Sequence, residues 1–232
     1  MNPTTMLTPV AQDLWTAHHP MRLLGMPMTA AMTVVRLAHR LWIHSPIPLP
    51  AALRGELDAL GAAAWAVAPN RHHHLFALDF LAAYPAAQLF IAPRLVTKVA
   101  GLAGFPTIPT DASAPWHGAI DGLLIEGNSE MSETVFFHRP SKSLIVSDLG
   151  VHFGPWNAGM TQLYARLNGC HGRFGQTLLL KLPYRDKAAA RASLQRVLAW
   201  DFERIVPAHG PVIENGAHAA FEQAFAWLLR GK

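Results

Sequence analysis

Three short segments of this chain carry side chains suited to binding a metal ion, and each follows a run typical of a strand. Residues 70–74 (NRHHH) come directly after an apolar run, Asp148 ends a run of β-branched and apolar residues, and His209 lies just beyond another. Imidazole nitrogens and a carboxylate oxygen together suit zinc or a similar divalent transition metal. In layered α/β proteins, loops from distant parts of the sequence converge at strand ends. We therefore expect the three segments to meet at one metal site.

Each segment also has an ordinary structural explanation. An Asp at the end of a strand commonly caps a helix or forms a turn, and a His beside Gly-Pro commonly lies in a loop. Three consecutive His residues also occur as a surface cluster. It is the order and spacing of the three segments together that favours a metal site.

The elements that must position these segments alternate between strands and helices. The first half predicts strands within residues 21–45 with a turn near residues 38–40, a helix over 51–60, a strand over 64–68, a helix ending near 83 and a strand over 88–92. The second half predicts a β-meander over 123–126, 134–138 and 143–147, helices near 157–167 and 187–198, a strand over 204–206 and a final helix over 217–229. Neither a linker nor a repeat separates the halves, so we expect one α/β domain, residues 1–232, with two facing sheets and helices outside.

Composition narrows the classes of function. Hydrophobic residues make up 51% of the chain and charged residues 15%, which is typical of a globular protein. The net charge is +4 and the basic residues are scattered, which argues against a nucleic-acid partner. The single Cys170 excludes an internal disulfide and fits a reducing compartment. The start of the chain lacks the pattern of a signal peptide, and no apolar stretch reaches about 20 residues, so we expect a cytoplasmic protein without a membrane partner.

Four motifs give the sequence a resemblance to a known superfamily. They are residues 68–75 (APNRHHHL), 133–138 (ETVFFH), 144–149 (LIVSDL) and 206–211 (VPAHGP). With these motifs the chain resembles the metallo-β-lactamase superfamily, and more closely an uncharacterised bacterial and plant branch of it, from about Thr33 to the C-terminus. The resemblance implies a four-layer αβ/βα sandwich. The superfamily pattern is a His-x-His-x-Asp-His motif, a later Gly-His, a strand-terminal Asp and a His-containing turn before the last helix.

The first motif departs from that pattern in a way that implies one metal ion. When His73 and His74 are aligned with the Asp-His pair, Pro69 and Arg71 fall on the two earlier His positions, and residues 128–133 contain no His. The ligands specific to the first metal are then all absent.

The ligands of the second metal remain. The resemblance implies that His74, Asp148 and His209 bind one divalent transition metal ion, most simply zinc, with His73 in place of the aspartate. Arg71 and Glu133 would fill the emptied first site as an ion pair. A competing alignment places His72 and His74 on ligand positions beside Asn70, and puts Leu75 where the second metal needs its His.

The resemblance implies a metal-binding protein and leaves its activity open between two functions. One is a mononuclear metal-dependent hydrolase of an unknown small ester-, amide- or phosphate-like substrate, and the other is a non-catalytic relative that uses the fold for binding or assembly. A third reading is a metal-free interaction protein with a surface His cluster. His44 and His152 either line the same cleft or have structural roles.

Overall fold

The first of the two large sheets contains a long antiparallel hairpin. In the computed structural model, which describes residues 6–23 and 25–230, this sheet contains six strands in chain order. They are β1 (Thr8–Ala11), β2 (Leu14–Leu23), β3 (Met26–Leu37), β4 (Arg40–His44), β5 (Ala62–Ala68) and β6 (Gln88–Ile91). The first four pair antiparallel, whereas β5 and β6 add in parallel. Parallel neighbours need a crossover, and helices α1 (Ala51–Leu60) and α2 (Ala77–Ala83) supply it.

The second sheet has four strands in the order β12-β9-β8-β7. They are β7 (Ile120–Leu124), β8 (Thr134–His138), β9 (Ser143–Val146) and β12 (Arg204–Pro207), and β12 is parallel to β9. Between β9 and β12 the chain forms a small two-stranded sheet and three helices, and two more helices follow β12. These elements are β10 (Val151–Phe153), α3 (Gly159–Leu167), β11 (Arg173–Gly175), α4 (Leu178–Lys181), α5 (Lys187–Leu198), α6 (Ala217–Ala224) and α7 (Ala226–Leu229). Two short 3₁₀ helices, η1 (Leu95–Thr97) and η2 (Ala100–Leu102), follow β6.

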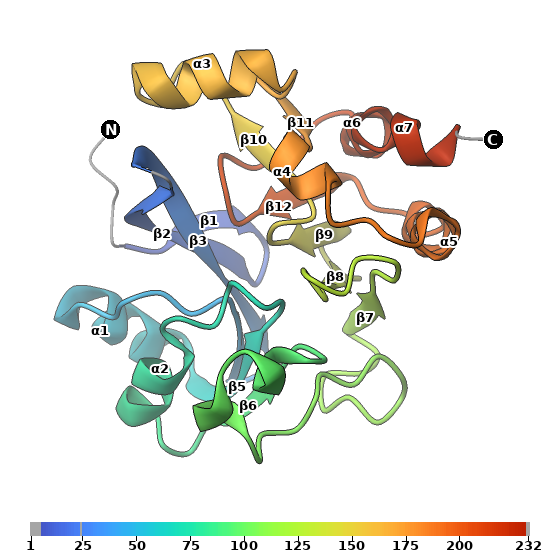
Figure 1. The fold of residues 1–232 in the computed structure, drawn as a ribbon. Coiled ribbons are helices and arrows are strands. Elements are labelled where there is room, and N and C mark those ends of the chain that lie inside the picture. Colours follow the sequence, from blue (N-terminus) through green and yellow to red (C-terminus); the bar gives the residue numbers. More distant parts are fainter. Residues whose placement is uncertain (1–5, 24, 231–232) are drawn as a thin grey trace.

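Alternation of side chains along the second sheet builds two cores. Phe136, Ile145 and Val206 pack towards the first sheet, while their neighbours in sequence pack towards α5, α6 and α7. Helices α1 and α2 contact β5 on the other side of the molecule (Figure 1). The layers are therefore helices, sheet, sheet and helices, which is the four-layer αβ/βα arrangement that the sequence predicts.

Several predicted elements are confirmed, and four are corrected. The helix over 51–60 and the turn at residues 38–40 are present as expected. The first sheet, however, starts at Thr8 and not near residue 21, and the final helix breaks at Phe225. The small sheet of β10 and β11 and the short helix α4 were not predicted, because elements of three or four residues are too short to show a period.

The early hairpin was missed because His18-His19-Pro20 resembles a strand break. Pro20 nevertheless lies inside β2, opposite Thr29 of β3. On its other side, within the described part of the chain, β1 pairs with residues 14–16 and no described residue pairs with Pro20. A proline is tolerated in a strand at such an open edge.

Within the described residues, no helix has both the length and the apolar character needed to cross a bilayer. The single domain over residues 1–232 stays a prediction. Part of it, and part of the N-terminal segment examined for a signal peptide, lies outside the described residues.

The interface between the sheets depends on Trp42, which is fully buried on β4. Its ring centroid lies 4.9 Å from that of Phe136 on β8 and 5.9 Å from that of Trp116. Trp42→Ala should lower the free energy of unfolding by about 3–5 kcal/mol, because it leaves a cavity between the sheets. Trp156→Ala is the matched control, since Trp156 is 48% exposed, and should cost about 1 kcal/mol. Urea denaturation measures both, and equal losses would contradict this account of the core.

Candidate metal centre

Asn70 shapes the loop that follows β5. Its side chain is fully buried, and its Oδ1 accepts hydrogen bonds from the backbone N–H groups of His72 and His73, each at 2.8 Å. This side-chain cap turns the chain back towards the sheets. It presents His73 to the interior, where His73 Nδ1 lies 2.5 Å from Ser45 Oγ at the end of β4.

Asp148 is held at the end of β9 by two buried residues. The Glu133 carboxylate accepts hydrogen bonds from the backbone N–H groups of Ser147 and Asp148, each at 2.8 Å. Asn70 Nδ2 then donates to both carboxylates, at 3.0 Å to Glu133 Oε2 and 2.9 Å to Asp148 Oδ2. Asn70 and Glu133 together fix the position of the Asp148 side chain.

His209 follows β12, and its ring is oriented by the first sheet. His209 Nδ1 donates to the backbone carbonyl of Thr29 on β3 at 2.8 Å. Gly210 has φ +115°, and a Cβ there would overlap the carbonyl oxygen of His152. A side chain at this position is therefore excluded, and the turn places His209 between the two sheets.

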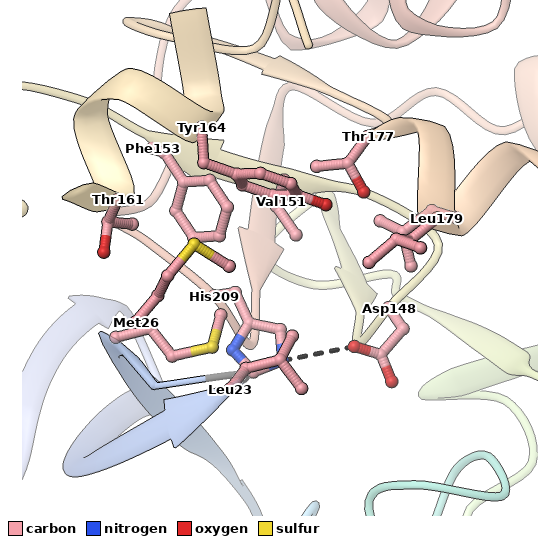
Figure 2. Close-up of a pocket in the computed structure, with 12 residues that line it drawn as sticks. Leu23, Met26, Asp148, Val151, Phe153, Thr161, Tyr164, Thr177, Leu179 and His209 are labelled. Carbon is pink, nitrogen blue, oxygen red and sulfur yellow. Dashed lines mark hydrogen bonds and ion pairs between the residues drawn. The ribbon is translucent and has the colours of Figure 1, made fainter. Parts of the chain in front are cut away.

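The three side chains converge on one point. His73 Nε2 lies 3.1 Å from His209 Nε2 and 3.4 Å from Asp148 Oδ2, and His209 Nε2 lies 3.2 Å from Asp148 Oδ1. Ligand atoms held about 2.0–2.1 Å from a tetrahedral ion are about 3.3 Å apart, so these spacings fit one zinc-sized ion. Both rings use Nδ1 for a protein oxygen, which leaves Nε2 free to bind metal, as is usual for metal-binding His. Figure 2 shows the contact between His209 and Asp148.

Three of the four ligands expected from the sequence are therefore brought together, and His74 is not among them. Among the described residues, the group of side chains close enough together to hold a metal ion consists of His73, Asp148 and His209. His74 has a structural contact through its backbone, because its carbonyl accepts a hydrogen bond from the N–H of Ala77 at the start of α2. His72, which the competing alignment uses as a ligand, has Nδ1 3.4 Å from Lys98 Nζ. Consecutive side chains in a turn point in different directions, so one imidazole of the three faces Asp148.

The expected ion pair between Arg71 and Glu133 is not formed. Arg71 Nη1 contacts Glu130 Oε2 at 3.2 Å, and Asn70 takes its place beside Glu133. An amide suits this position because it offers a donor to the carboxylates and an acceptor to the loop backbone. The sequence signal for this contact is Asn70 itself, a turn-forming residue two positions after the end of β5.

Charge in the site is arranged unequally between the two carboxylates. Burial, and then the charge of Asp148, raise the pKa of Glu133 to about 7. Burial alone would also raise the pKa of Asp148, but His73 and His209 beside it hold that pKa well below its usual range. Burial lowers the pKa of His209, yet the hydrogen bond and charge of Asp148 outweigh it, so this pKa is raised. Asp148 is thus the anion of the site.

The other two His candidates have separate surroundings. His44 is buried and stacks on Trp42, and burial followed by the nearby His73 lowers the pKa of His44 to about 3. It is therefore neutral and part of the core beside the site. His152 Nδ1 lies 3.0 Å from the Pro211 carbonyl, which ties β10 to the loop after His209.

A pocket opens onto Asp148 and His209 (Figure 2). Its volume is about 470 Å³, including the part open to solvent.

Comparison with known proteins agrees with this fold and adds a family. The model of a family described as "Domain of unknown function (DUF4336)" matches residues 11–173, more than two thirds of the chain. The chain belongs to the DUF4336 family. The match starts earlier than the likeness expected from about Thr33, and it includes the early hairpin. Among curated proteins, no relative matches this DUF4336 chain.

Solved structures show that this DUF4336 protein has the metallo-β-lactamase fold. A metallo-β-lactamase from Pontibacter korlensis has a TM-score of 0.64 at 14% identity, with 97% of this chain and 99% of that chain covered. One from Erythrobacter litoralis, with beta mercaptoethanol in the active site, has a TM-score of 0.66 at 13% identity and covers 97% and 94%. The metallo-β-lactamase FIM-1 from Pseudomonas aeruginosa, in its mono-zinc form, has a TM-score of 0.62 at 12% identity and covers 97% and 93%. The TM-scores establish the shared fold, whereas sequence identities this low leave the activity open.

The position of Asn70 between two carboxylates generates a prediction. Asn70→Asp keeps an oxygen for the loop N–H groups but replaces the donor with a third carboxylate. In metal-free protein at neutral pH it should lower the free energy of unfolding by about 3 kcal/mol. The loss should shrink as pH falls, because a protonated Asp can donate again.

The control is Asn157→Asp, because Asn157 uses its Oδ1 to accept from Gly154 N–H at 2.9 Å and an Asp retains that oxygen. Urea denaturation in the presence of a chelator measures both variants. Equal stability of Asn70→Asp and Asn157→Asp would show that the Asn70 donor does not hold the carboxylates.

Proposed function

We propose that this protein binds one zinc ion through His73, Asp148 and His209 and hydrolyses a small substrate. The observation that carries the proposal is the mutual 3.1–3.4 Å spacing of two Nε2 atoms and the Asp148 carboxylate beside an open pocket. Three protein ligands with a free fourth position are typical of catalytic zinc sites, whereas structural zinc sites are closed by four. The mono-zinc form of one structural neighbour provides a precedent for a single ion in this fold.

The residues of the chain have distinct roles in this proposal. His73 and His209 would donate Nε2 as neutral imidazoles, and Asp148 would supply the single negative charge. When bound, the zinc ion supplies Lewis-acid polarisation of a carbonyl or phosphoryl group and lowers the pKa of water. Asn70 and Glu133 position Asp148, and Ser45 and the Thr29 carbonyl orient the two rings.

The surroundings of Asn70 support a single ion. The amide Nδ2 lies within hydrogen-bond distance of both Glu133 and Asp148, so these carboxylates are already linked by a neutral donor. Pro69 and Arg71 carry no group that ligates zinc.

Binding without turnover is the second candidate function. It is favoured by the contacts of Asp148, whose two carboxylate oxygens both have partners in Asn70 and the two imidazoles. A hydrolase needs a group to accept a proton from water, and Glu133 is only 2% exposed behind Asn70. Assays of the zinc-loaded protein on matched nitrophenyl esters, anilides and phosphates separate the two: turnover that a chelator abolishes supports the hydrolase.

The ligand set predicts metal content. Protein purified without a His tag should hold about one zinc ion per chain. His73→Ala, Asp148→Ala and His209→Ala should each reduce the content to almost none, because two ligands do not hold the ion. Elemental analysis of folded protein, checked by circular dichroism, measures this.

The neighbouring histidines are the matched controls. His72→Ala and His74→Ala should retain about one ion, since neither imidazole belongs to the convergent group. Two tightly held ions in the wild type, or loss of zinc from His72→Ala but not from His73→Ala, would contradict the assignment.

The electrostatics of His209 predict how zinc affinity depends on pH. Because the pKa of His209 is raised above the ordinary 6.5, a proton competes with zinc at a higher pH than for a free imidazole. Affinity should therefore fall as pH decreases from about 8 to 5.5, by about tenfold per pH unit for each proton displaced. Asp148 should add no slope, as its pKa lies far below this range. Competition titrations with a chelating dye measure the slope, and a constant affinity would refute imidazole ligation.

A further inference from the structure

The pocket beside the candidate zinc site has an apolar wall built from three separate elements. The β2–β3 hairpin contributes Met26 and Met28, β10 contributes Val151 and Phe153, and α4 with its preceding turn contributes Leu179. Figure 2 shows Met26, Val151, Phe153 and Leu179 in the same pocket as Asp148 and His209. The wall is therefore apolar up to the proposed ligands themselves.

Charge is absent from the rest of this lining. Of the described residues that line the pocket, the titratable side chains near its base are Asp148 and His209, and no Lys or Arg is present. The Thr161 hydroxyl donates to the Pro27 carbonyl at 2.7 Å and so is engaged by the protein. The hydroxyls of Tyr164 and Thr177 supply the remaining polarity (Figure 2). A phosphate or a carboxylate beyond the reacting group would find no cation in this wall, and burying it there would be costly.

We propose that the pocket selects a neutral ester or amide with an unbranched apolar acyl chain, a proposal that rests on the proposed hydrolase function. Two of the three proposed ligands, Asp148 and His209, line the pocket, so the carbons attached to the reacting carbonyl would extend into it. In the reaction, water adds to the carbonyl carbon and the bond to the alcohol oxygen or amine nitrogen breaks. The products are a carboxylic acid and an alcohol or amine, and the acid carries the apolar chain.

The first measurement is the affinity for ligands whose apolar tails differ in length. Acetohydroxamic, butyrohydroxamic and hexanohydroxamic acids share one zinc-binding head group, which is uncharged in free solution at neutral pH and loses a proton when it binds zinc, and they differ only in the apolar tail. Calorimetric titration of the zinc-loaded protein should show affinity rising by up to about fourfold for each methylene that is buried. A series with no rise in affinity would overturn the proposal.

Charge at the end of the chain is the second measurement. The monohydroxamic acid of adipic acid has the same length as hexanohydroxamic acid but ends in a carboxylate. It should bind at least tenfold more weakly, since the wall offers no cation. Equal or tighter binding would overturn the selection for a neutral chain.

Two leucines on one helix provide a matched pair of variants. Leu179 lines the pocket and is 47% exposed, whereas Leu178 does not line it and is 61% exposed. Both tolerate substitution without emptying the core. Leu179→Asp should abolish the gain in affinity with chain length, and Leu178→Asp should leave it unchanged. An identical gain in both variants would overturn the assignment of the wall.

These titrations test the proposal for the pocket separately from the proposed hydrolase function, because hydroxamic acids bind without turnover. A chain-length effect in a protein that hydrolyses nothing would keep the pocket and reject the hydrolase. If the protein holds no zinc, the methyl NMR signals of Met26 and Met28 provide the test in metal-free protein. Hexanamide, but not acetamide, should shift them, and the absence of any shift would overturn the pocket.

Discussion

The Asn70 side chain links the parts of the candidate site, because one buried amide serves two sheets at once. Its Oδ1 caps the loop after β5, and its Nδ2 bridges Glu133, just before β8 of the second sheet, and Asp148, just after β9 of that sheet. Few side chains combine an acceptor and a two-proton donor at this length. Ala would leave two carboxylates facing each other across a void, and Asp would add a third negative charge. The orientation of His73 and the position of Asp148 are therefore set by the same residue.

This link also explains how the protein tolerates two buried carboxylates. Glu133 has three N–H partners and a raised pKa, and Asp148 has a depressed pKa and two imidazole neighbours. Such a division keeps the more acidic carboxylate, Asp148, close to the pocket and the carboxylate with the raised pKa, Glu133, behind it. A divalent ion bound by two neutral imidazoles and Asp148 would retain a net charge of +1. That residual charge would attract an electron-rich carbonyl or phosphoryl oxygen.

The sequence predicted the convergence of the site better than its details. The ends of β5, β9 and β12 were predictable, because each is marked by an apolar run followed by a polar residue, and Asp148 and His209 follow two strands that pair in parallel. Which of the consecutive imidazoles faces Asp148 was not predictable. That choice depends on the cap made by Asn70, and sequence periodicity does not describe a turn. The pairing of Arg71 with Glu130, where the sequence had suggested Glu133, likewise depends on the path of the loop.

The same contrast separates the metal side of the site from the pocket side. The proposed ligands stand at the ends of strands with strong patterns, and those positions were identified from sequence alone. The apolar wall comes instead from the β2–β3 hairpin, from β10 and from α4. The sequence predicted the start of the hairpin too far along the chain, and it did not predict β10 or α4. A three-residue strand and a four-residue helix are stabilised by packing against the rest of the molecule and not by their own propensity. In this chain the candidate ligand positions could be found from the sequence, whereas the apolar wall of the pocket required the structure.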